Sequence, residues 1–301
     1  MNNSISNIST EDIVILLLTT RLSNKDVLTA LSFSEFYKLC EILKKHKYEI
    51  TDLLRLEILK DISNTYNINI DYNLLSMQRH AYCIEKIREW SKNNINVITC
   101  NNPHYPDILK KYKYSPTVLY VYGNIEHLNK KHVIIQGEDV ANKQSKEQIE
   151  LNNISSILGK FTCIDKPLAF YDLYSFINKN VLYGTNKSDR VTSTIFISSG
   201  FYEYLSKYQN YNFLIKKKRI CLLSFWHPDK KSDIITKRYS SKIFNIFSIE
   251  KYLVHLSSDE DIKKLKLFQF LKNKNNTLYI RPGIFKSNVF KNLGAKFFVT
   301  T

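Results

Sequence analysis

The sequence predicts an α/β protein, in which an extended Rossmann-like, mostly parallel sheet with helices on both faces follows a small all-α N-terminal domain. Three observations lead to this prediction. Apolar residues recur at helical spacing over about the first 93 residues. From Asn94 onwards, short apolar runs alternate with helical patterns, as in βαβ units. These runs are continuously apolar, which is typical of strands that are buried on both faces.

The N-terminal domain is predicted over residues 1–93. Ser9 precedes two acids, Glu11 and Asp12, and an apolar stretch that starts at Ile13. A hydroxyl followed by acids in the first turn is typical of a capped helix start. The further helices expected in this domain are Phe33–Leu43, Ile50–Tyr66 and Leu74–Asn93.

The α/β domain is predicted over residues 94–301. Pro106 suits a first helical turn because proline has no N–H to leave unpaired there, and Gly123-Asn124 is a turn dipeptide. The expected strands are Val97–Cys100, Val118–Tyr122, Val133–Ile135, Phe161–Ile164, Thr194–Ser198, Arg219–Ser224, Tyr252–Ser257 and Thr277–Arg281. The expected helices are Lys143–Leu158, Leu168–Asn178, Tyr202–Lys218, Thr236–Phe247 and Asp259–Lys272.

The positive charge is concentrated in the last third of the chain. The formal net charge is +16, and residues 205–296 hold 20 Lys and Arg against 6 Asp and Glu, a net of +14. A basic surface of this size favours a polyanionic partner, of which nucleic acid is the commonest. The alternative is a lysine-rich surface that only contacts water, since the many Asn, Lys, Ile and Tyr residues suggest an AT-rich genome.

The cysteine and hydropathy patterns predict a cytoplasmic protein without a membrane partner. The five cysteines (Cys40, Cys83, Cys100, Cys163 and Cys221) are widely spaced and form no CxxC pair, which is typical of reduced thiols. The longest apolar run near the N-terminus, Ile13–Leu18, is far shorter than a membrane span.

A family resemblance runs from about Ile98 to Val299 and rests on the order of several segments. Tyr105-Pro106 opens a short helix, and Pro116 leads into an apolar strand that ends at Gly123-Asn124. Further matching segments are Thr194–Gly200, Leu222–Pro228, Lys242–Ser248, Leu253–Leu256, Leu278–Gly283 and Leu293–Ala295. The chain resembles the DprA/Smf family of DNA-processing proteins. The resemblance implies a Rossmann-like domain preceded by a helical module of the SAM or helix-hairpin-helix type.

The departures from the family pattern fall on its anion-binding loops. Gly-Ser-Arg after the first parallel strand is here Gly137-Glu138-Asp139, and Asp165–Leu168 replaces a Ser-Gly-x-Ala-x-Gly loop. Arg-Asn-Arg has become Ser240-Ser241-Lys242, and a Ser-Gly-Ser-Leu turn has become Ser258–Asp261. Carboxylates oppose a phosphate, and bulky residues keep it from the backbone N–H groups. We therefore expect that the anion pocket has lost its phosphate-binding groups and that the protein has no nucleotide cofactor. We also expect a diverged family member without the C-terminal winged-helix domain.

The resemblance implies a function in DNA uptake and recombination. The family binds and protects single-stranded DNA and delivers it to RecA during natural transformation (competence), acting as a dimer. By family position, Gly137, Gly200 and Gly283 would line the pocket. The alternative is a diverged Rossmann-like regulatory or partner-binding module, of the phage-defence or nucleotide-sensing type, that has lost its anion pocket. A third possibility is drift in a genome that no longer transforms.

Basic residues on or before two predicted elements are the candidates for contact with DNA phosphates. Arg238 and Lys242 lie where the family has a basic helix, and Lys237 is their neighbour. The run of Lys216, Lys217, Lys218 and Arg219 precedes a strand. The tyrosines that could stack on bases are Tyr204, Tyr208, Tyr211 and Tyr239. The alternative is that the lysines contact water at helix ends and the tyrosines pack in the core.

No residue pattern supports catalysis. Asp165 and Asp172 are seven apart, but acid–base work needs a partner at hydrogen-bond distance. Asp259–Asp261 opens a predicted helix, where acids interact favourably with the helix dipole, so we expect a capping role. The seven histidines show no zinc-ligand spacing, and neither GxSxG nor a P-loop is present. The sequence predicts a protein that is not an enzyme and has no catalytic residue, metal or cofactor.

Overall fold

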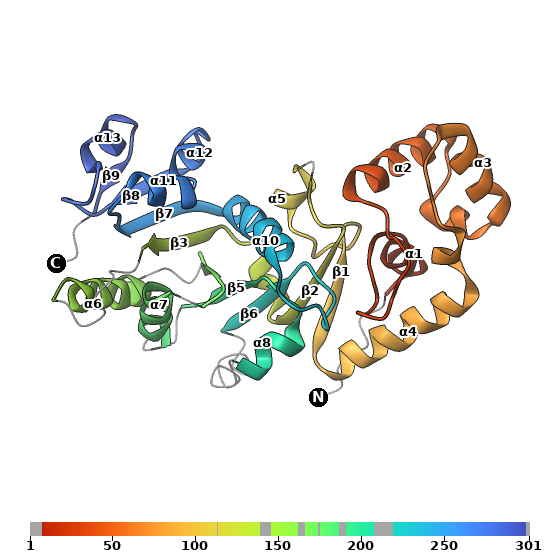
Figure 1. The fold of residues 1–301 in the computed structure, drawn as a ribbon, viewed down its shortest axis with the longest axis horizontal. Helices are drawn as coiled ribbons and strands as arrows, with labels where there is room; N and C mark the ends of the chain where they lie inside the picture. The colour runs from red at the N-terminus through yellow and green to blue at the C-terminus, as the bar shows by residue number, and fades with distance from the viewer. Residues whose placement is uncertain are drawn as a thin grey trace. The chain divides into compact units, whose positions relative to one another are not determined.

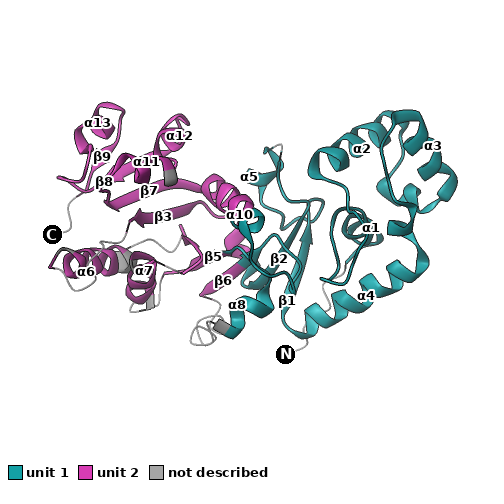
Figure 2. Ribbon diagram, in the orientation of Figure 1, with its two compact units in different colours: residues 1–125, 197–212, 223–237 teal, residues 126–196, 213–222, 238–301 magenta. Residues whose placement is uncertain are grey.

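The computed structural model divides the chain into two compact units (Figures 1 and 2). Unit 1 comprises residues 1–125, 197–212 and 223–237, and unit 2 comprises residues 126–196, 213–222 and 238–301. Unit 1 therefore holds the N-terminal helices together with the first two strands. The domain boundary expected near residue 93 stays a prediction. The structure describes residues 8–112, 114–138, 146–161, 166–173, 175–186, 191–207 and 219–298.

The N-terminal part of unit 1 is helical, as the periodicity predicts. Helix α1 (Thr10–Thr19) begins at a capping box, in which Ser9 accepts from the Asp12 N–H and Asp12 accepts from the Ser9 N–H. It is buried over Val14–Leu18, so it forms the centre of the helical layer. Around it lie α2 (Phe33–His46), a 3₁₀ turn (Ile50–Leu54), α3 (Leu56–Tyr66), a second 3₁₀ turn (Tyr72–Leu75) and α4 (Met77–Lys92).

A buried ion pair joins α4 to the segment that follows α1. The Arg79 guanidinium lies 2.5 Å from the Asp26 carboxylate, with side-chain exposures of 7% and 4%. Burial raises the pKa of Asp26, but the N–H of Leu22 and the charge of Arg79 outweigh it and lower the pKa overall. Arg79 also donates to the Thr20 carbonyl. The pair thus fixes the turn after α1 against α4.

Two antiparallel strands complete the first part of unit 1. Strand β1 (Ile95–Thr99) pairs with β2 (Val118–Gly123), with Ile95 opposite Tyr122. Between them lies α5 (Asp107–Lys110). Pro106 is the residue before this helix and has an extended ψ of 126°, so its expected place inside the first turn is wrong by one residue. Helix α8 (Phe201–Lys207) also belongs to this unit.

Unit 2 is built on parallel strands. Strands β3 (His132–Gly137), β4 (Leu168–Tyr171), β5 (Ser193–Ile197), β7 (Ser248–His255), β8 (Thr277–Ile280) and β9 (Lys296–Phe297) follow the order β5-β4-β3-β7-β8-β9, and all of these neighbours pair in parallel. Strand β6 (Ile220–Ser224) begins in unit 2, next to β5. The order reverses direction at β3, as in doubly wound folds.

Helices cover both faces of this sheet, as the sequence predicts. His132 packs against Phe247 of α10 (Ile234–Phe247), with ring centroids 5.6 Å apart. Gly137, five residues later and on the opposite face of β3, lies against Ile177 of α7 (Phe176–Asn186). Figure 1 shows α7 and α6 (Lys146–Phe161) on one side of β3 and β7, and α10 and α11 (Asp259–Lys264) on the other. The remaining helices are α12 (Leu267–Leu271) and α13 (Ser287–Asn292).

Five element predictions are wrong in part. The helices expected over Ile50–Tyr66 and Leu74–Asn93 each begin with a 3₁₀ turn that an extended residue, Arg55 or Ser76, separates from the α-helix. The helix expected over Leu168–Asn178 is a strand, β4, followed by α7, because the short run after Pro167 pairs with β3 and β5 on both edges. The strand expected from Phe161 fails at that residue, which ends α6, and residues 162–165 lie outside the described part. The helix expected over Asp259–Lys272 is split where Lys266 takes a φ of +53°.

The four cysteines that the structure describes are free thiols, and Cys83 and Cys221 are buried like small apolar residues. Burial raises the pKa of the Cys83 thiol to about 12. Within the described residues, no helix combines the length and apolar character that a bilayer crossing requires.

Candidate nucleic-acid interface

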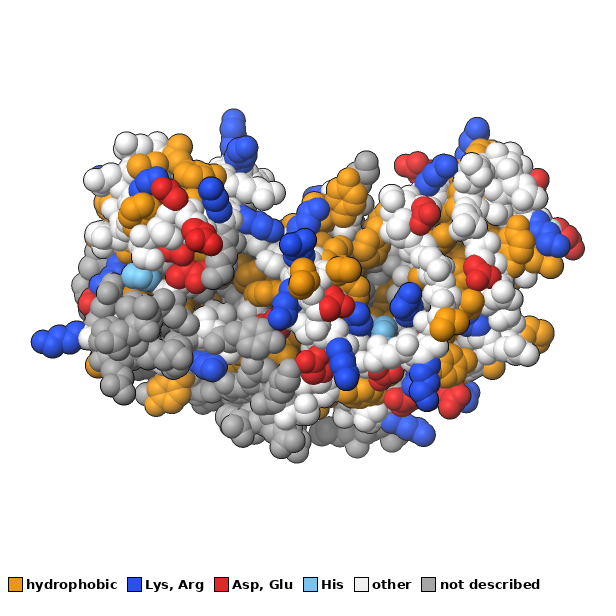
Figure 3. All heavy atoms as spheres, viewed as in Figure 1, with side chains coloured by type: hydrophobic (Ala, Val, Ile, Leu, Met, Phe, Trp, Pro, Cys, Tyr) orange, Lys and Arg blue, Asp and Glu red, His pale blue; other side chains and the backbone are white. Residues whose placement is uncertain are grey.

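Helix α10 presents a row of exposed side chains that combines apolar and basic groups. Ile234, Arg238 and Lys242 follow one another at four-residue intervals, so they lie along one face of the helix. Lys237 and Ile235 are also exposed, and Ile234 and Ile235 are 69% and 74% accessible. Figure 3 shows Lys and Arg side chains gathered over α10. We call the set Ile234, Ile235, Lys237, Arg238 and Lys242 the α10 surface.

The opposite side of α10 anchors the helix. Phe244 and Phe247 pack edge-on against Phe196 of β5, with ring centroids 5.3 and 4.8 Å apart. The start of the helix is fixed by Asp233, whose carboxylate accepts from the Thr236 N–H at 2.8 Å. The Thr236 hydroxyl in turn accepts from the Asp233 N–H at 2.9 Å. These contacts hold the exposed row of the α10 surface in place.

A further lysine lies close to the C-terminal half of this row. Burial and the nearby positive charge of Lys242 lower the pKa of Lys266, the residue before α12. Two lysines that repel each other gain from an anion placed between them. The sequence analysis missed Lys266, because only the fold brings it near α10. The basic area of unit 2 therefore extends from Arg238 through Lys242 to Lys266.

Of the basic run expected before β6, the structure describes only Arg219, and its side chain bonds to other parts of the protein. The Arg219 guanidinium donates to the carbonyls of Thr185, at 2.5 Å, and of Val191. It therefore joins the end of α7 to the start of β6. Lys216, Lys217 and Lys218 lie outside the described residues. The contact of these four residues with DNA stays a prediction.

Of the tyrosines that could stack on bases, Tyr204 follows the alternative and packs in the core. It lies on α8 and is only 3% exposed, so its ring is not available to a base. Tyr239 on α10 is partly exposed. Tyr208 and Tyr211 lie outside the described residues.

The turn after β7 is filled by one of the protein's own carboxylates. Asp261 Oδ2 accepts hydrogen bonds from the Ser257 N–H at 3.0 Å, the Ser257 hydroxyl at 2.8 Å and the Ser258 N–H at 2.9 Å. Burial raises the pKa of Asp261, but these bonds outweigh it and lower the pKa. The donors at this helix start are those that a phosphate would use. The capping role expected for Asp259–Asp261 is confirmed at Asp261.

In the loop before α10, a carboxylate of the protein also accepts a hydrogen bond from a backbone N–H. The N–H of Ser232 donates to the Glu203 carboxylate of α8 at 2.8 Å. Gly200 lies directly against this loop, and its N–H donates to the Lys230 carbonyl at 2.7 Å. A Cβ at Gly200 would lie 2.3 Å from the Pro228 carbonyl oxygen. Gly200 is thus required for contact between two chain segments of unit 1.

The two other glycines of the expected pocket differ in their surroundings. A Cβ at Gly137 would lie 2.9 Å from Ile177 Cδ1 and 2.9 Å from the backbone nitrogen of His255, so protein atoms fill the space beside it. Gly283 has a φ of +80° and open space around it, as a turn requires. The pocket-lining role of Gly137, Gly200 and Gly283 stays a prediction.

The basic residues after β8 are paired with carboxylates. Arg281 forms an ion pair with Glu150 of α6, and Lys286 forms one with Asp259, 2.5 Å apart. Within the described residues, no cluster of three or more His, Cys, Asp or Glu side chains could hold a metal ion. The exposed basic side chains of α10 and the neighbouring Lys266 are the candidates for contact with a polyanion.

Comparison with solved structures identifies similar folds. DNA processing protein A (DprA) from Streptococcus pneumoniae aligns with a TM-score of 0.54 and 14% sequence identity, over 90% of this chain and 96% of that chain. DprA from Helicobacter pylori, reported for its unique single-stranded DNA binding mode, aligns with a TM-score of 0.50 and 10% identity, over 68% of this chain and 91% of that chain. No family model and no curated protein matches.

The DprA-like fold that the segment order predicts is therefore confirmed. The match extends over nearly the whole chain and includes the helical N-terminal part as well as the sheet. At identities of 14% and 10%, the likeness establishes the fold, and the fold alone does not assign an activity.

Proposed function

We propose that this protein binds single-stranded DNA through the α10 surface and Lys266. The observation that carries the proposal is the exposed basic row on α10, in a fold shared with proteins of which one is reported to bind single-stranded DNA. Phosphate contacts from Lys and Arg provide affinity without sequence preference. Ile234 and Ile235 offer apolar area for bases or sugars beside the cations.

The two helix starts whose backbone N–H groups already bond to carboxylates limit how a DNA strand would bind. Asp261 and Glu203 occupy the backbone N–H groups at two helix starts where a phosphate could otherwise sit. Binding would then rely on long side chains at the surface and would depend strongly on salt. We also propose that the protein acts by binding and not by catalysis. By analogy with DprA, protection of incoming DNA, delivery to RecA and action as a homodimer complete the proposal.

The experiment is fluorescence anisotropy of a labelled oligo-dT against the purified protein, from low to physiological salt. The test variant is Arg238→Glu/Lys242→Glu. The matched control is Lys44→Glu/Lys60→Glu, which makes the same change of net charge on two exposed lysines of α2 and α3. Each lost phosphate contact should reduce the slope of log K against log salt by about 0.7. We therefore expect the test variant to weaken binding and flatten this slope by about 1.4, with little effect of the control.

Equal weakening by both double variants would assign the binding to overall charge and reject the α10 surface. If wild-type protein does not bind at low salt, the DNA-binding proposal is wrong. The second candidate is then a partner-binding module. It is favoured by the same two helix starts and by the exposed Ile234 and Ile235, and a pull-down with the Ile234→Ser/Ile235→Ser variant as control would test it.

A further inference from the structure

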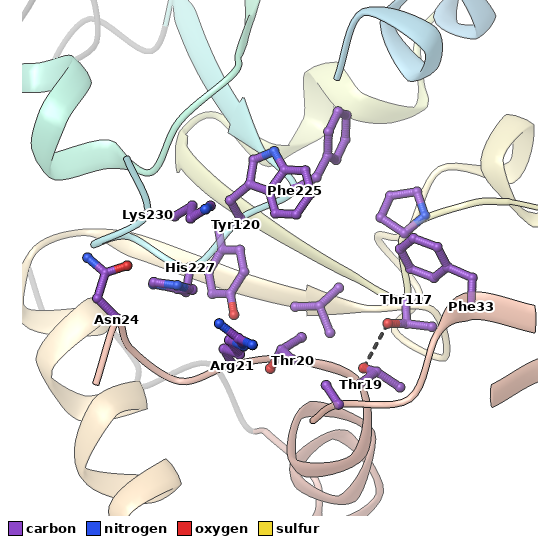
Figure 4. A pocket seen from close by; sticks show the side chains of 14 residues that line it. Thr19, Thr20, Arg21, Asn24, Phe33, Thr117, Tyr120, Phe225, His227 and Lys230 are labelled. Atoms are coloured by element: carbon purple, nitrogen blue, oxygen red, sulfur yellow. Dashed lines mark hydrogen bonds between the residues drawn. The ribbon is translucent and has the colours of Figure 1, made fainter. Parts of the chain in front are cut away.

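Unit 1 contains a cavity that the proposed DNA-binding surface does not use. Its volume is about 310 Å³, at the lower end of the range for small-molecule sites. Its wall is formed by the end of α1 and the segment after it, by the start of β2, and by the loop that follows β6 (Figure 4). All of these segments belong to unit 1, so the cavity lies within one compact unit.

Two buried polar groups at this cavity have unused hydrogen-bonding capacity. His227 Nδ1 has no partner among the described residues, and the Tyr120 hydroxyl interacts with the Thr20 side chain but can form a further hydrogen bond. Tyr120 is 0% exposed and His227 is 7% exposed, so bulk water does not satisfy them readily. A buried polar group without a partner is destabilising, so a ligand that supplies the missing hydrogen bond is favoured. Figure 4 shows both side chains on the same side of the cavity, next to Arg21.

Two cations line the cavity, and no carboxylate is among the described residues of its wall. They are Arg21 and Lys230, and the Lys230 ammonium is ion-paired with Asp233, which lies outside the wall, at 2.7 Å. Burial, followed by the charges of Lys230 and Arg21, lowers the pKa of His227 to about 4. The imidazole is therefore neutral at pH 7, and its free nitrogen can accept or donate one hydrogen bond according to the tautomer. Asp26, the nearby acid, is held by Arg79.

Three aromatic side chains also line the cavity, together with aliphatic residues and the polar side chains of Thr19, Thr20, Asn24 and Thr117. Phe33 lies on one side of the cavity and Phe225 on the other (Figure 4), and Trp226 is the third aromatic residue of the wall. Aromatic side chains in the wall favour a planar ligand, because aromatic faces stack on any heteroaromatic ring. The cavity therefore combines three aromatic side chains, two uncharged polar groups and two cations.

We propose that this cavity binds one nucleotide monophosphate unit. The base would lie between the aromatic side chains and meet Tyr120 and His227 with its polar edge. The phosphate would contact Arg21 and Lys230. The same chemistry can come from a free mononucleotide or from one nucleotide of a strand. The inference does not depend on DNA binding at α10, since the two sets of residues are separate.

The test uses the full chain and follows Trp226 fluorescence during titration with dTMP, dAMP and inorganic phosphate. The chain has two tryptophans, and only Trp226 lines the cavity, whereas Trp90 is fully buried. Calorimetry of the same titrations gives the affinity directly. We expect saturable quenching by a mononucleotide, with inorganic phosphate at least tenfold weaker because it lacks the base.

The test variant is Arg21→Gln and the matched control is Lys25→Gln. Both side chains are exposed, lie on the same segment and lose one positive charge, but Lys25 does not line the cavity. Loss of a charge-assisted phosphate contact should weaken mononucleotide binding by roughly tenfold or more in the first variant only. The Arg238→Glu/Lys242→Glu variant should bind the mononucleotide as the wild type does, whether or not it binds DNA.

Absence of saturable binding by calorimetry at millimolar mononucleotide would overturn the proposal, as would equal weakening by Arg21→Gln and Lys25→Gln. Binding of phosphate as tight as that of dTMP would also overturn it, because the base would then contribute nothing. Displacement of the mononucleotide by oligo-dT supports the proposal with a strand as the source. Binding that oligo-dT leaves unchanged supports it with a free nucleotide as the source.

Discussion

Lys251 on β7 is a buried lysine that pairs with no carboxylate among the residues that the structure describes, and its replacement should stabilise unit 2. The residue is 1% exposed, and its Nζ donates to Asn245 Oδ1 at 2.6 Å and lies 4.6 Å from the centroid of the Phe270 ring. The adjacent Glu250 is paired with Lys166. Burial, followed by the charge of Lys266, lowers the pKa of Lys251 from 10.5 to about 7.

The size and sign of the effect follow from this pKa. Between about pH 7 and 10.5 the unfolded chain holds a proton on Lys251 that the folded chain does not, so stability rises with pH across this range. The free energy of unfolding rises by about 1.4 kcal/mol per pH unit in this range. The full destabilisation caused by the buried charge, reached below pH 7, is at most about 5 kcal/mol. Lys251→Met removes this penalty but loses the hydrogen bond to Asn245 and leaves the half-buried Asn245 side chain without this donor, together about 2 kcal/mol.

The assay is urea unfolding of the wild type and Lys251→Met at pH 7 and pH 9. We expect the variant to be more stable by about 2 kcal/mol at pH 7 and about equal at pH 9, because the penalty shrinks by about 2 kcal/mol between the two. Titration of other groups cancels in the difference between the two proteins. A variant that is less stable at both pH values, by the same amount, would show that Lys251 is not held neutral by burial.

Three further predictions concern stability. Asp26→Asn should cost about 3 kcal/mol in urea unfolding at pH 7, since it leaves Arg79 buried without a counter-charge. This loss should shrink as the pH falls through the lowered pKa of Asp26, where wild-type protein also loses the ion pair. Gly200→Ala should lower the unfolding free energy by about 1–3 kcal/mol, because its Cβ overlaps backbone oxygen, whereas Gly283→Ala should cost only about 1. Arg219→Met should cost about 1–2 kcal/mol in urea unfolding, because it removes the hydrogen bonds to the carbonyls of Thr185 and Val191.

Local patterns were enough to predict most elements of the fold. The cap at Ser9, the continuous apolar strands and the periodicity of α10 depend on residues near one another in sequence, and each is found as predicted. The order of short motifs also predicted a DprA-like fold at identities of 14% and 10% to the solved structures. The strand at Leu168 was missed because pairing with β3 and β5 decides its conformation, and neither partner is its neighbour in sequence.

The basic residues of α10 and the acids at the positions of the family's anion-binding loops can be recognised from the sequence by itself, because charge and helical spacing are local properties. Only the tertiary structure decides how those groups are used. It turns Arg219 towards carbonyl oxygens, buries Tyr204, brings Lys266 close to Lys242 and encloses the cavity beside Tyr120. Burial and distance between remote residues are properties of packing, and no spacing along the chain encodes them.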